Sequence, residues 1–393
     1  MFWGTPLTFV NARVVAPGGR LARTLRVRRG RIDGVDVAPD RDDTVVDAGG
    51  ACVFPGLVNA HDHLELNAQP RLKWRDRYDN VREWIDDFQP RFDSPELAVN
   101  RPETLDDRVW IGGLKNLLAG TTTVCHHNPL HPVLRRAFPV RVVRAYGFSH
   151  SLQIDGARVP LSFRQTPAAW PWLIHAAEGV DGEARREIET LRASGCLAAN
   201  TVIVHGVGLD EAGRDAMLAA GAGLVWCPSS NAFLFGATAD VRAFDDADRL
   251  ALGSDSRLSG EGDLLDELRA AYATRQLSPQ GLSRIVTEGA GRLLRLPSAG
   301  RLVPGAPADL VVLQAAAADP FEVLVSASRR DVRLTMIGGA PQVAVPELAP
   351  VFRATRTACE PARLDGAPRL VARWLARRVA RLRLQEPGFE VGR

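Results

Sequence analysis

The chain has 393 residues, 46% of them apolar, and a formal net charge of +3. This length and apolar content suffice for one large or two modest hydrophobic cores, and so small a charge argues against nucleic-acid binding. The five scattered cysteines are typical of reduced thiols and predict a cytoplasmic protein. The sequence has neither a basic start followed by an apolar stretch nor an apolar run long enough to span a bilayer, so we expect no export signal and no membrane insertion.

Both ends of the sequence read as short strands separated by turns. At the start these are residues 7–15, 24–37 and 44–53, and the same style resumes at 301–313 and 332–345. Between these ends, residues 64–108 are long for a loop after a first strand and predict a partly helical cover over a pocket.

The stretch PGLVNAHDH (Pro55–His63) ends in two histidines separated by one residue. Side chains two apart on a strand point to the same face, so His61 and His63 can bind one metal ion together. Imidazole suits zinc and similar divalent metals. The alternative for an isolated pair is that both are ordinary surface or core histidines.

Three later segments combine a short apolar run with a polar residue at its end. They are WLIHAAEG (Trp172–Gly179), TVIVHGVG (Thr201–Gly208) and LALGSDS (Leu250–Ser256), and each predicts a buried strand followed by a loop. Residues 183–194, 209–220 and 264–276 between and after them have helical spacing. Alternating strands and helices predict an α/β protein with a parallel sheet, which keeps its chemistry at the carboxyl ends of the strands.

Seven motifs in order resemble the amidohydrolase superfamily, in particular its aminohydrolases and chlorohydrolases of nitrogen heterocycles. They are PGLVNAHDH, GTTTV (Gly120–Val124), IHAAEG, VHGVGL, CPSSN (Cys227–Asn231), LGSDS and GRLVPGAPADLVVL (Gly300–Leu313). The resemblance implies a (β/α)8 TIM barrel over 55–298 and a small β-sandwich built from residues 1–54 and 299–350. Residues 351–393 fall outside it, and the apolar stripe from Leu370 to Leu382 predicts a basic amphipathic helical tail that docks on the protein, binds a partner or lies on a membrane.

The resemblance also implies a site. Its metal ligands would be His61, His63, His175 and Asp255, with Asp255 also holding the attacking water, Glu178 carrying a proton to the substrate nitrogen and His205 bonding the attacked centre. Taken alone, Glu178 and Asp255 also suit helix caps, and His205 suits a packed core residue. Further residues near the same strand ends are candidates for substrate contact: Glu65, His126, His127, Arg144, His150 and Asn231.

Lysine is scarce in this sequence, and this bears on the number of metal ions. Lys73 and Lys115 are the two lysines among 49 basic residues. Two-metal relatives usually bridge their ions with a modified lysine on the fourth barrel strand, which we place at 140–148, where there is none. We therefore expect one divalent ion, zinc first, with iron or manganese as alternatives.

The resulting hypothesis is a metal-dependent hydrolase of C–N bonds that deaminates an aminated heterocycle through a metal-bound hydroxide. Two alternatives share the site: hydrolysis of an amide or cyclic amide, and loss of another leaving group such as halide or an alkylamine. A catalytically silent binding protein is the alternative from another class. The expected partner is a small molecule, with a homodimer left open, and the sequence does not identify the substrate.

Overall fold

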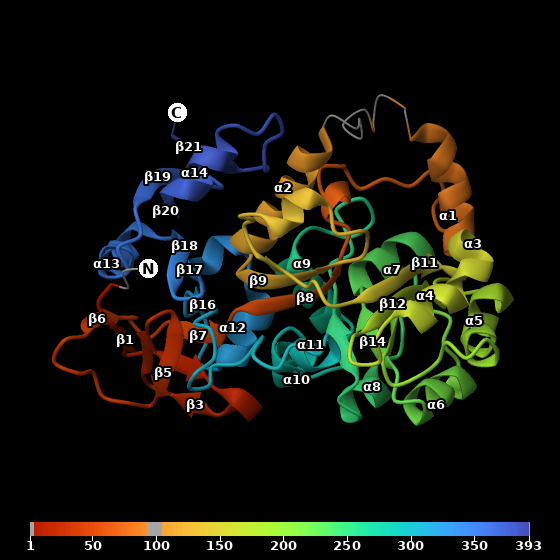
Figure 1. Cartoon of the computed structure of the whole chain (residues 1–393), viewed down its shortest axis with the longest axis horizontal. Coiled ribbons are helices and arrows are strands. Elements are labelled where there is room, and N and C mark those ends of the chain that lie inside the picture. The colour runs from red at the N-terminus through yellow and green to blue at the C-terminus, as the bar shows by residue number, and fades with distance from the viewer. Residues whose placement is uncertain (1–3, 93, 95–96, 98–103, 393) are drawn as a thin grey trace.

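The computed structural model describes residues 4–92, 94, 97 and 104–392. Its centre is formed by a three-stranded and a five-stranded sheet, both wholly parallel, on the right of Figure 1. The first has the order β10-β9-β8 and the second runs from β11 to β15 in sequence order. Their strands are β8 (Leu57–Asp62), β9 (Thr121–His126), β10 (Arg141–Val142), β11 (Gly147–Ser151), β12 (Trp172–Ala176), β13 (Thr201–His205), β14 (Gly223–Trp226) and β15 (Leu250–Leu252).

Helices surround these strands, and the protein is an α/β protein as predicted. Strands β8, β9, β12 and β13 are buried along their whole length, as is typical of parallel sheets covered on both faces. The helices predicted over 183–194, 209–220 and 264–276 are α5 (Gly182–Ala193), α6 (Glu211–Ala219) and α9 (Leu264–Ala273). Asp181, Asp210 and Asp263 cap their first turns with side-chain oxygens.

The remaining α-helices connect the strands or cover the two chain ends. They are α1 (Val81–Phe88), α2 (Leu105–Leu118), α3 (Leu152–Asp155), α4 (Val159–Gln165), α7 (Pro228–Phe235), α8 (Arg242–Asp246), α10 (Pro279–Ile285), α11 (Glu288–Leu293), α12 (Pro320–Ser326), α13 (Ala349–Ala354) and α14 (Arg373–Val379). Among the described residues, no helix is both long enough and apolar enough to cross a membrane.

The first and last parallel strands meet at their carboxyl ends. Asp62 and Asp255 form a parallel bridge just beyond the paired segments. A Cβ added to Gly253 would lie 2.7 Å from the Cβ of His61, so only glycine permits this approach. The glycine in LGSDS therefore brings the loop after β15 against the end of β8.

The two chain ends combine in one nine-stranded sheet, on the left of Figure 1. Strand β7 pairs with β16 from the far end of the sequence, which confirms that the strands predicted at both ends lie together. A four-stranded sheet, β5-β4-β1-β6, shares a hydrophobic cluster with it. The strands are β1 (Leu7–Val10), β2 (Arg13–Val15), β3 (Leu21–Ala22), β4 (Leu25–Arg28), β5 (Arg31–Val35), β6 (Thr44–Asp47), β7 (Cys52–Pro55), β16 (Leu310–Leu313), β17 (Val332–Ile337), β18 (Ala340–Ala344), β19 (Cys359–Leu364), β20 (Ala367–Ala372) and β21 (Phe389–Val391).

The prediction of a helical tail over 351–393 is wrong for most of that segment. Strands β19 and β20 form a hairpin, β20 pairs with β18, and β21 completes the sheet edge. The turn between the hairpin strands holds Asp365 and Gly366, both at positive φ (50° and 81°), which is the pattern of a tight type I′ hairpin. Only α14 is helical within the predicted stripe, and its Leu375 is fully buried.

The structure gives more detail on two further predictions, the fourth parallel strand and the cover at 64–108. Residues 140–148, predicted as the fourth strand, contain β10 and the start of β11, so the fourth parallel strand is β11 and ends in His150 and Ser151. Neither strand contains a lysine. In the predicted cover at 64–108, the structure shows α1 and short 3-10 turns, while residues 93, 95–96 and 98–103 lie outside the described part of the chain.

Replacement of Leu375 by alanine tests whether the C-terminal segment is part of the folded core. Leu375 is 0% exposed, so Leu375→Ala should lower the free energy of unfolding by about 2–5 kcal/mol in chemical denaturation. Leu21, which is 50% exposed, provides the control, and Leu21→Ala should change it by less than about 0.5 kcal/mol. Equal, negligible effects of both substitutions would show a loosely attached tail.

Candidate active site

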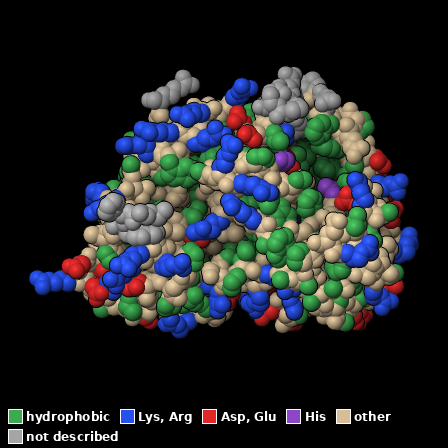
Figure 2. Space-filling model, viewed as in Figure 1, with side chains coloured by type: hydrophobic (Ala, Val, Ile, Leu, Met, Phe, Trp, Pro, Cys, Tyr) green, Lys and Arg blue, Asp and Glu red, His purple; other side chains and the backbone are tan. Residues whose placement is uncertain are grey.

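All eight histidines of the sequence lie at or just after the carboxyl ends of parallel strands. They follow or end β8 (His61 and His63), β9 (His126, His127 and His131), β11 (His150), β12 (His175) and β13 (His205). Figure 2 shows histidine side chains beside a hollow in the upper part of the face in view. The carboxyl ends of the strands are therefore the chemically distinctive face of the protein.

Three imidazoles and one carboxylate converge at this face. The Nε2 atom of His175 lies 3.2 Å from Nε2 of His63 and 3.3 Å from Nε2 of His61. The Oδ1 atom of Asp255 lies 3.4 Å from Nε2 of His61 and 3.7 Å from Nε2 of His63. Ligand atoms bound tetrahedrally at zinc distances lie about 3.4 Å apart, so these spacings fit one shared ion.

In the rings of His61 and His175, the hydrogen bond made by Nδ1, which faces away from the cluster, fixes which ring nitrogen carries the proton. The carbonyl of Ser149 accepts from Nε2 of His127 (2.9 Å), so Nδ1 of His127 must accept from Nδ1 of His61 (3.1 Å). In the same way, Nδ1 of His175 donates to the carbonyl of His150 (2.7 Å). The Nε2 atoms of His61 and His175 are then unprotonated and carry the lone pairs that a metal requires.

The electrostatics agree with neutral ligands. Burial, and then the neighbouring imidazoles, hold the pKa of His63 and that of His175 well below 6.5. The buried lone pairs of His61 and His175 face each other at 3.3 Å and repel unless a cation lies between them. The residues therefore fit a divalent metal ion, by the chemistry of the donor set.

Asp255 is oriented by two serine hydroxyls, one from α7 and one from its own loop. Its Oδ2 atom accepts hydrogen bonds from Ser230 (2.7 Å) and Ser259 (2.6 Å), which leaves Oδ1 to face the histidines. Its backbone has a positive φ of 56°, an uncommon conformation for a residue with a side chain. Burial opposes ionisation of Asp255, but contact with His61 and the field of His205 hold its pKa well below 3.8.

Glu178 and His205 form a second pair beside this cluster. Oε1 of Glu178 lies 3.5 Å from Nε2 of His205, and Nδ1 of His205 is 2.8 Å from Oδ1 of Asn231. Burial, and then the charge of Asp255, raise the pKa of Glu178 well above 4.5. Burial lowers the pKa of His205 to about 4. Glu178 can therefore hold a proton near neutral pH while His205 stays neutral.

A cavity of about 490 Å³ opens onto these residues. Its wall includes His63, His175, Glu178, His205 and Asp255, and opposite them the apolar side chains of α1 and its surroundings, such as Trp84, Ile85, Phe88 and Leu258. The rings of Trp84 and Phe88 stack with centroids 5.1 Å apart. Such a space, polar at one end and apolar at the other, suits a small organic molecule.

The predicted substrate contacts occupy three kinds of position. Glu65 and His150 line the cavity, whereas His126, His127 and Asn231 are fully buried beside it. His127 and Asn231 instead orient His61 and His205, respectively. Arg144 is exposed between β10 and β11, away from the cavity lining.

Glu65, His126 and His131 form another group whose potential ligand atoms lie within 4.8 Å of one another. The backbone N–H of Leu64 donates to Nδ1 of His126 (3.4 Å), which places the proton of a neutral His126 on Nε2. That nitrogen faces Oε2 of Glu65 at 3.7 Å. The two atoms are too far apart for a hydrogen bond, and neither has a hydrogen-bond partner among the described residues.

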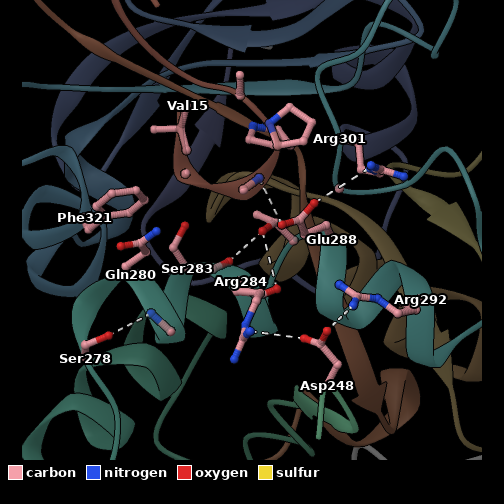
Figure 3. Close-up of a pocket in the computed structure, with 18 of the residues that line it drawn as sticks. Val15, Asp248, Ser278, Gln280, Ser283, Arg284, Glu288, Arg292, Arg301 and Phe321 are labelled. Atoms are coloured by element: carbon pink, nitrogen blue, oxygen red, sulfur yellow. Dashed lines mark hydrogen bonds and ion pairs between the residues drawn. The ribbon is translucent and has the colours of Figure 1, made fainter. Parts of the chain in front are cut away.

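A larger cavity, of about 660 Å³, lies at the other end of the strands (Figure 3). Its lining includes Pro55, just before β8, and Asp248, just before β15, so it borders the amino ends of the strands. It contains no histidine, and its arginines are paired with acidic residues. The pairs are Arg284 with Asp245 and Asp248, Arg292 with Asp248, and Arg301 with Glu288. This cavity therefore lacks the imidazole groups that converge at the opposite end of the strands.

The polar residues behind the converging histidines were not predicted from the sequence. They form a buried hydrogen-bonded network of Asp62, Lys115, Asn59, Asn116 and Ser254. The signal that pointed to them was a lysine in a chain that otherwise uses arginine almost everywhere.

The chain is similar to known proteins in sequence and in fold. Residues 171–341 match the amidohydrolase family. A 5-methylthioadenosine/S-adenosylhomocysteine deaminase of Natronomonas pharaonis is 27% identical, covering 76% of this chain and 82% of the relative. An 8-oxoguanine deaminase of Pseudomonas aeruginosa is also 27% identical, over 76% of this chain and 83% of the relative. An adenosine deaminase structure from Xanthomonas campestris with bound zinc superposes with a TM-score of 0.70 at 21% identity, covering 89% of this chain and 97% of that one.

Removal of a converging imidazole should remove the metal ion. We expect about one divalent ion per purified wild-type chain, and strongly reduced content in His63→Ala and His175→Ala, measured by elemental analysis after gel filtration. His131→Ala, outside this cluster, should retain the ion. Wild-type metal content in both cluster variants, or two ions per chain required for activity, would contradict the single site.

Proposed function

We propose that this protein, an amidohydrolase by its matched domain and its relatives, removes ammonia from an aminated nitrogen heterocycle with the help of one divalent metal ion. The observation that carries the proposal is the convergence of His61, His63, His175 and Asp255 beside a proton-holding Glu178. The two relatives described above are named as deaminases of purine compounds, which supports deamination as the reaction.

In this proposal the metal ion is held by the Nε2 atoms of the three histidines and by Oδ1 of Asp255. We propose zinc, because imidazole and carboxylate ligands suit it and because the adenosine deaminase neighbour contains it. When bound, a divalent ion supplies Lewis acidity and lowers the pKa of a water at its open position.

The chain's own residues then move the protons. Ser230 and Ser259 hold one oxygen of Asp255, so Oδ1 would face the attacking water. Glu178 donates its proton to the ring nitrogen of the substrate, which makes the ring more electrophilic, and its carboxylate then takes a proton from the attacking water. Glu178 passes that proton to the amino group, ammonia leaves, and the hydroxyl proton of the adduct returns to Glu178 as the oxo product forms. The raised pKa of Glu178 keeps this proton available near neutral pH.

The role of His205 is narrower than the resemblance implies. Its Nδ1 proton is directed to Asn231, so neutral His205 presents an unprotonated Nε2 to the site. That nitrogen faces Oε1 of Glu178 at 3.5 Å and can accept a hydrogen bond from the protonated carboxyl group. In this proposal His205 therefore positions the group that carries the proton.

We also propose that the eight parallel strands close into a (β/α)8 barrel and that the two sheets of the chain ends form a β-sandwich. Closure is supported by the bridge between Asp62 and Asp255 and by one hydrophobic cluster that takes side chains from β8, β9 and β12 to β15. The sandwich is supported by the hydrophobic cluster that both end sheets share.

Release of ammonia tests the reaction directly. The purified protein, loaded with zinc, is incubated with aminated purines, pyrimidines, pterins and triazines, and ammonia is measured by a coupled assay. We expect release from at least one class, with the corresponding oxo product by mass spectrometry. Ring opening of cyclic amides without ammonia, or release of halide or alkylamine alone, would replace deamination by one of the alternative reactions.

Substitution of the proton carrier should separate catalysis from folding. Glu178→Gln should lower kcat by about 10²- to 10⁴-fold, because glutamine keeps the shape but carries no transferable proton. The control is Glu189→Gln at a 62% exposed carboxylate, which should leave kcat unchanged. Unchanged turnover in Glu178→Gln at normal metal content would remove Glu178 from the mechanism.

A further inference from the structure

A buried ion pair lies directly behind the proposed metal ligands. Nζ of Lys115 is 2.9 Å from Oδ2 of Asp62, and both side chains are 0% exposed. Asp62 stands between His61 and His63 in the sequence, so its side chain leaves the strand on the opposite face. A buried ion pair often adds little stability compared with apolar residues, so its position next to the ligands calls for another explanation.

The carboxylate of Asp62 is saturated with donors. Oδ2 also accepts from Nδ2 of Asn116 (2.7 Å) and of Asn59 (3.1 Å), and Oδ1 accepts from Nδ2 of Asn67 (2.7 Å). Lys115 and Asn116 are neighbours on α2, so this network ties that helix to the end of β8. Every polar partner of the carboxylate is itself almost completely buried.

Lys115 also reaches the loop that carries Asp255. Its Nζ atom donates to Oγ of Ser254 (3.0 Å). The next residue, Asp255, is bound by backbone hydrogen bonds to both histidines of the pair, through its N–H to the carbonyl of His61 (3.1 Å) and through its carbonyl to the N–H of His63 (2.7 Å). One ammonium group therefore contacts two of the three chain segments that would supply metal ligands, those of His61–His63 and of Asp255.

A lysine at this position is unusual, because nearly all basic residues of this chain are arginines. Lys115 and Lys73 are the two lysines among 49 basic residues. A compact ammonium with three donors can fill the fully buried space between Asp62 and Ser254, whereas the broad planar guanidinium of arginine cannot replace it without displacing a neighbour. This space lies within the polar network and not at the cavity wall.

We propose that Lys115, through its ion pair with Asp62, is a positioning residue that holds the His61–His63 segment and the Ser254–Asp255 loop at the separation that one metal ion requires. The inference rests on the proposed metal-dependent function. It assigns to this lysine control of metal affinity, without contact with metal or substrate.

The test is the zinc affinity of the full-length protein, measured by competition with a chromogenic chelator. Lys115→Met should bind Zn²⁺ about 10- to 100-fold more weakly than the wild type, the usual effect of losing a group that orients metal ligands. Lys73→Met is the matched control and should bind as the wild type does. The double variant Asp62→Asn with Lys115→Met leaves no buried charge unpaired, so its affinity should lie between those of Lys115→Met and the wild type.

Thermal unfolding and circular dichroism of the metal-free proteins separate affinity from stability. A lower melting temperature of Lys115→Met with an unchanged zinc affinity would overturn the proposal, because the pair would then be structural only. Should Lys115→Met not fold, the double variant decides: reduced affinity supports the proposal and wild-type affinity overturns it. Absence of zinc binding by the wild type would instead contradict the proposed function itself.

Discussion

The proposed chemistry depends on one constraint: nitrogen atoms of three buried imidazoles must face one another at about 3.4 Å, the tetrahedral spacing at zinc distances. The unprotonated Nε2 atoms of His61 and His175 repel each other in the absence of a cation, so the fold has to impose their approach. Two rings are held in the required tautomer by backbone carbonyls, directly for His175 and through His127 for His61. Backbone hydrogen bonds between the end of β8 and the loop after β15 bring the carboxylate of Asp255 to these imidazoles.

The same burial assigns different tasks to two carboxyl groups. Asp255 is surrounded by imidazoles and two serine hydroxyls, and its pKa lies well below the ordinary value. Glu178 has no such donors among its described contacts, and its pKa is raised by burial and by the charge of Asp255. One group is thus an ionised ligand while the other keeps a transferable proton, the division that acid and base chemistry at neutral pH requires.

The convergence of His61, His63, His175 and Asp255 could be predicted from the sequence, because each sits in a short motif at a strand end and the motifs together resemble those of one family. The roles of His127 and Lys115 could not, since they depend on contacts between residues 22 to 139 positions apart. The helical spacing of apolar residues gave a wrong prediction in the C-terminal segment, where the residues from Leu370 to Leu382 fit a helical stripe. The Asp365-Gly366 pair was the stronger local signal, because both residues adopt the positive φ of a hairpin turn.

X-ray absorption at the zinc edge of the purified protein tests the central claim most directly. The account predicts a single zinc ion with nitrogen and oxygen ligands at about 2.0–2.2 Å and the multiple-scattering pattern of imidazoles. A sulfur ligand at about 2.3 Å would place the ion on a cysteine, outside the cluster of His61, His63, His175 and Asp255, and would contradict the account.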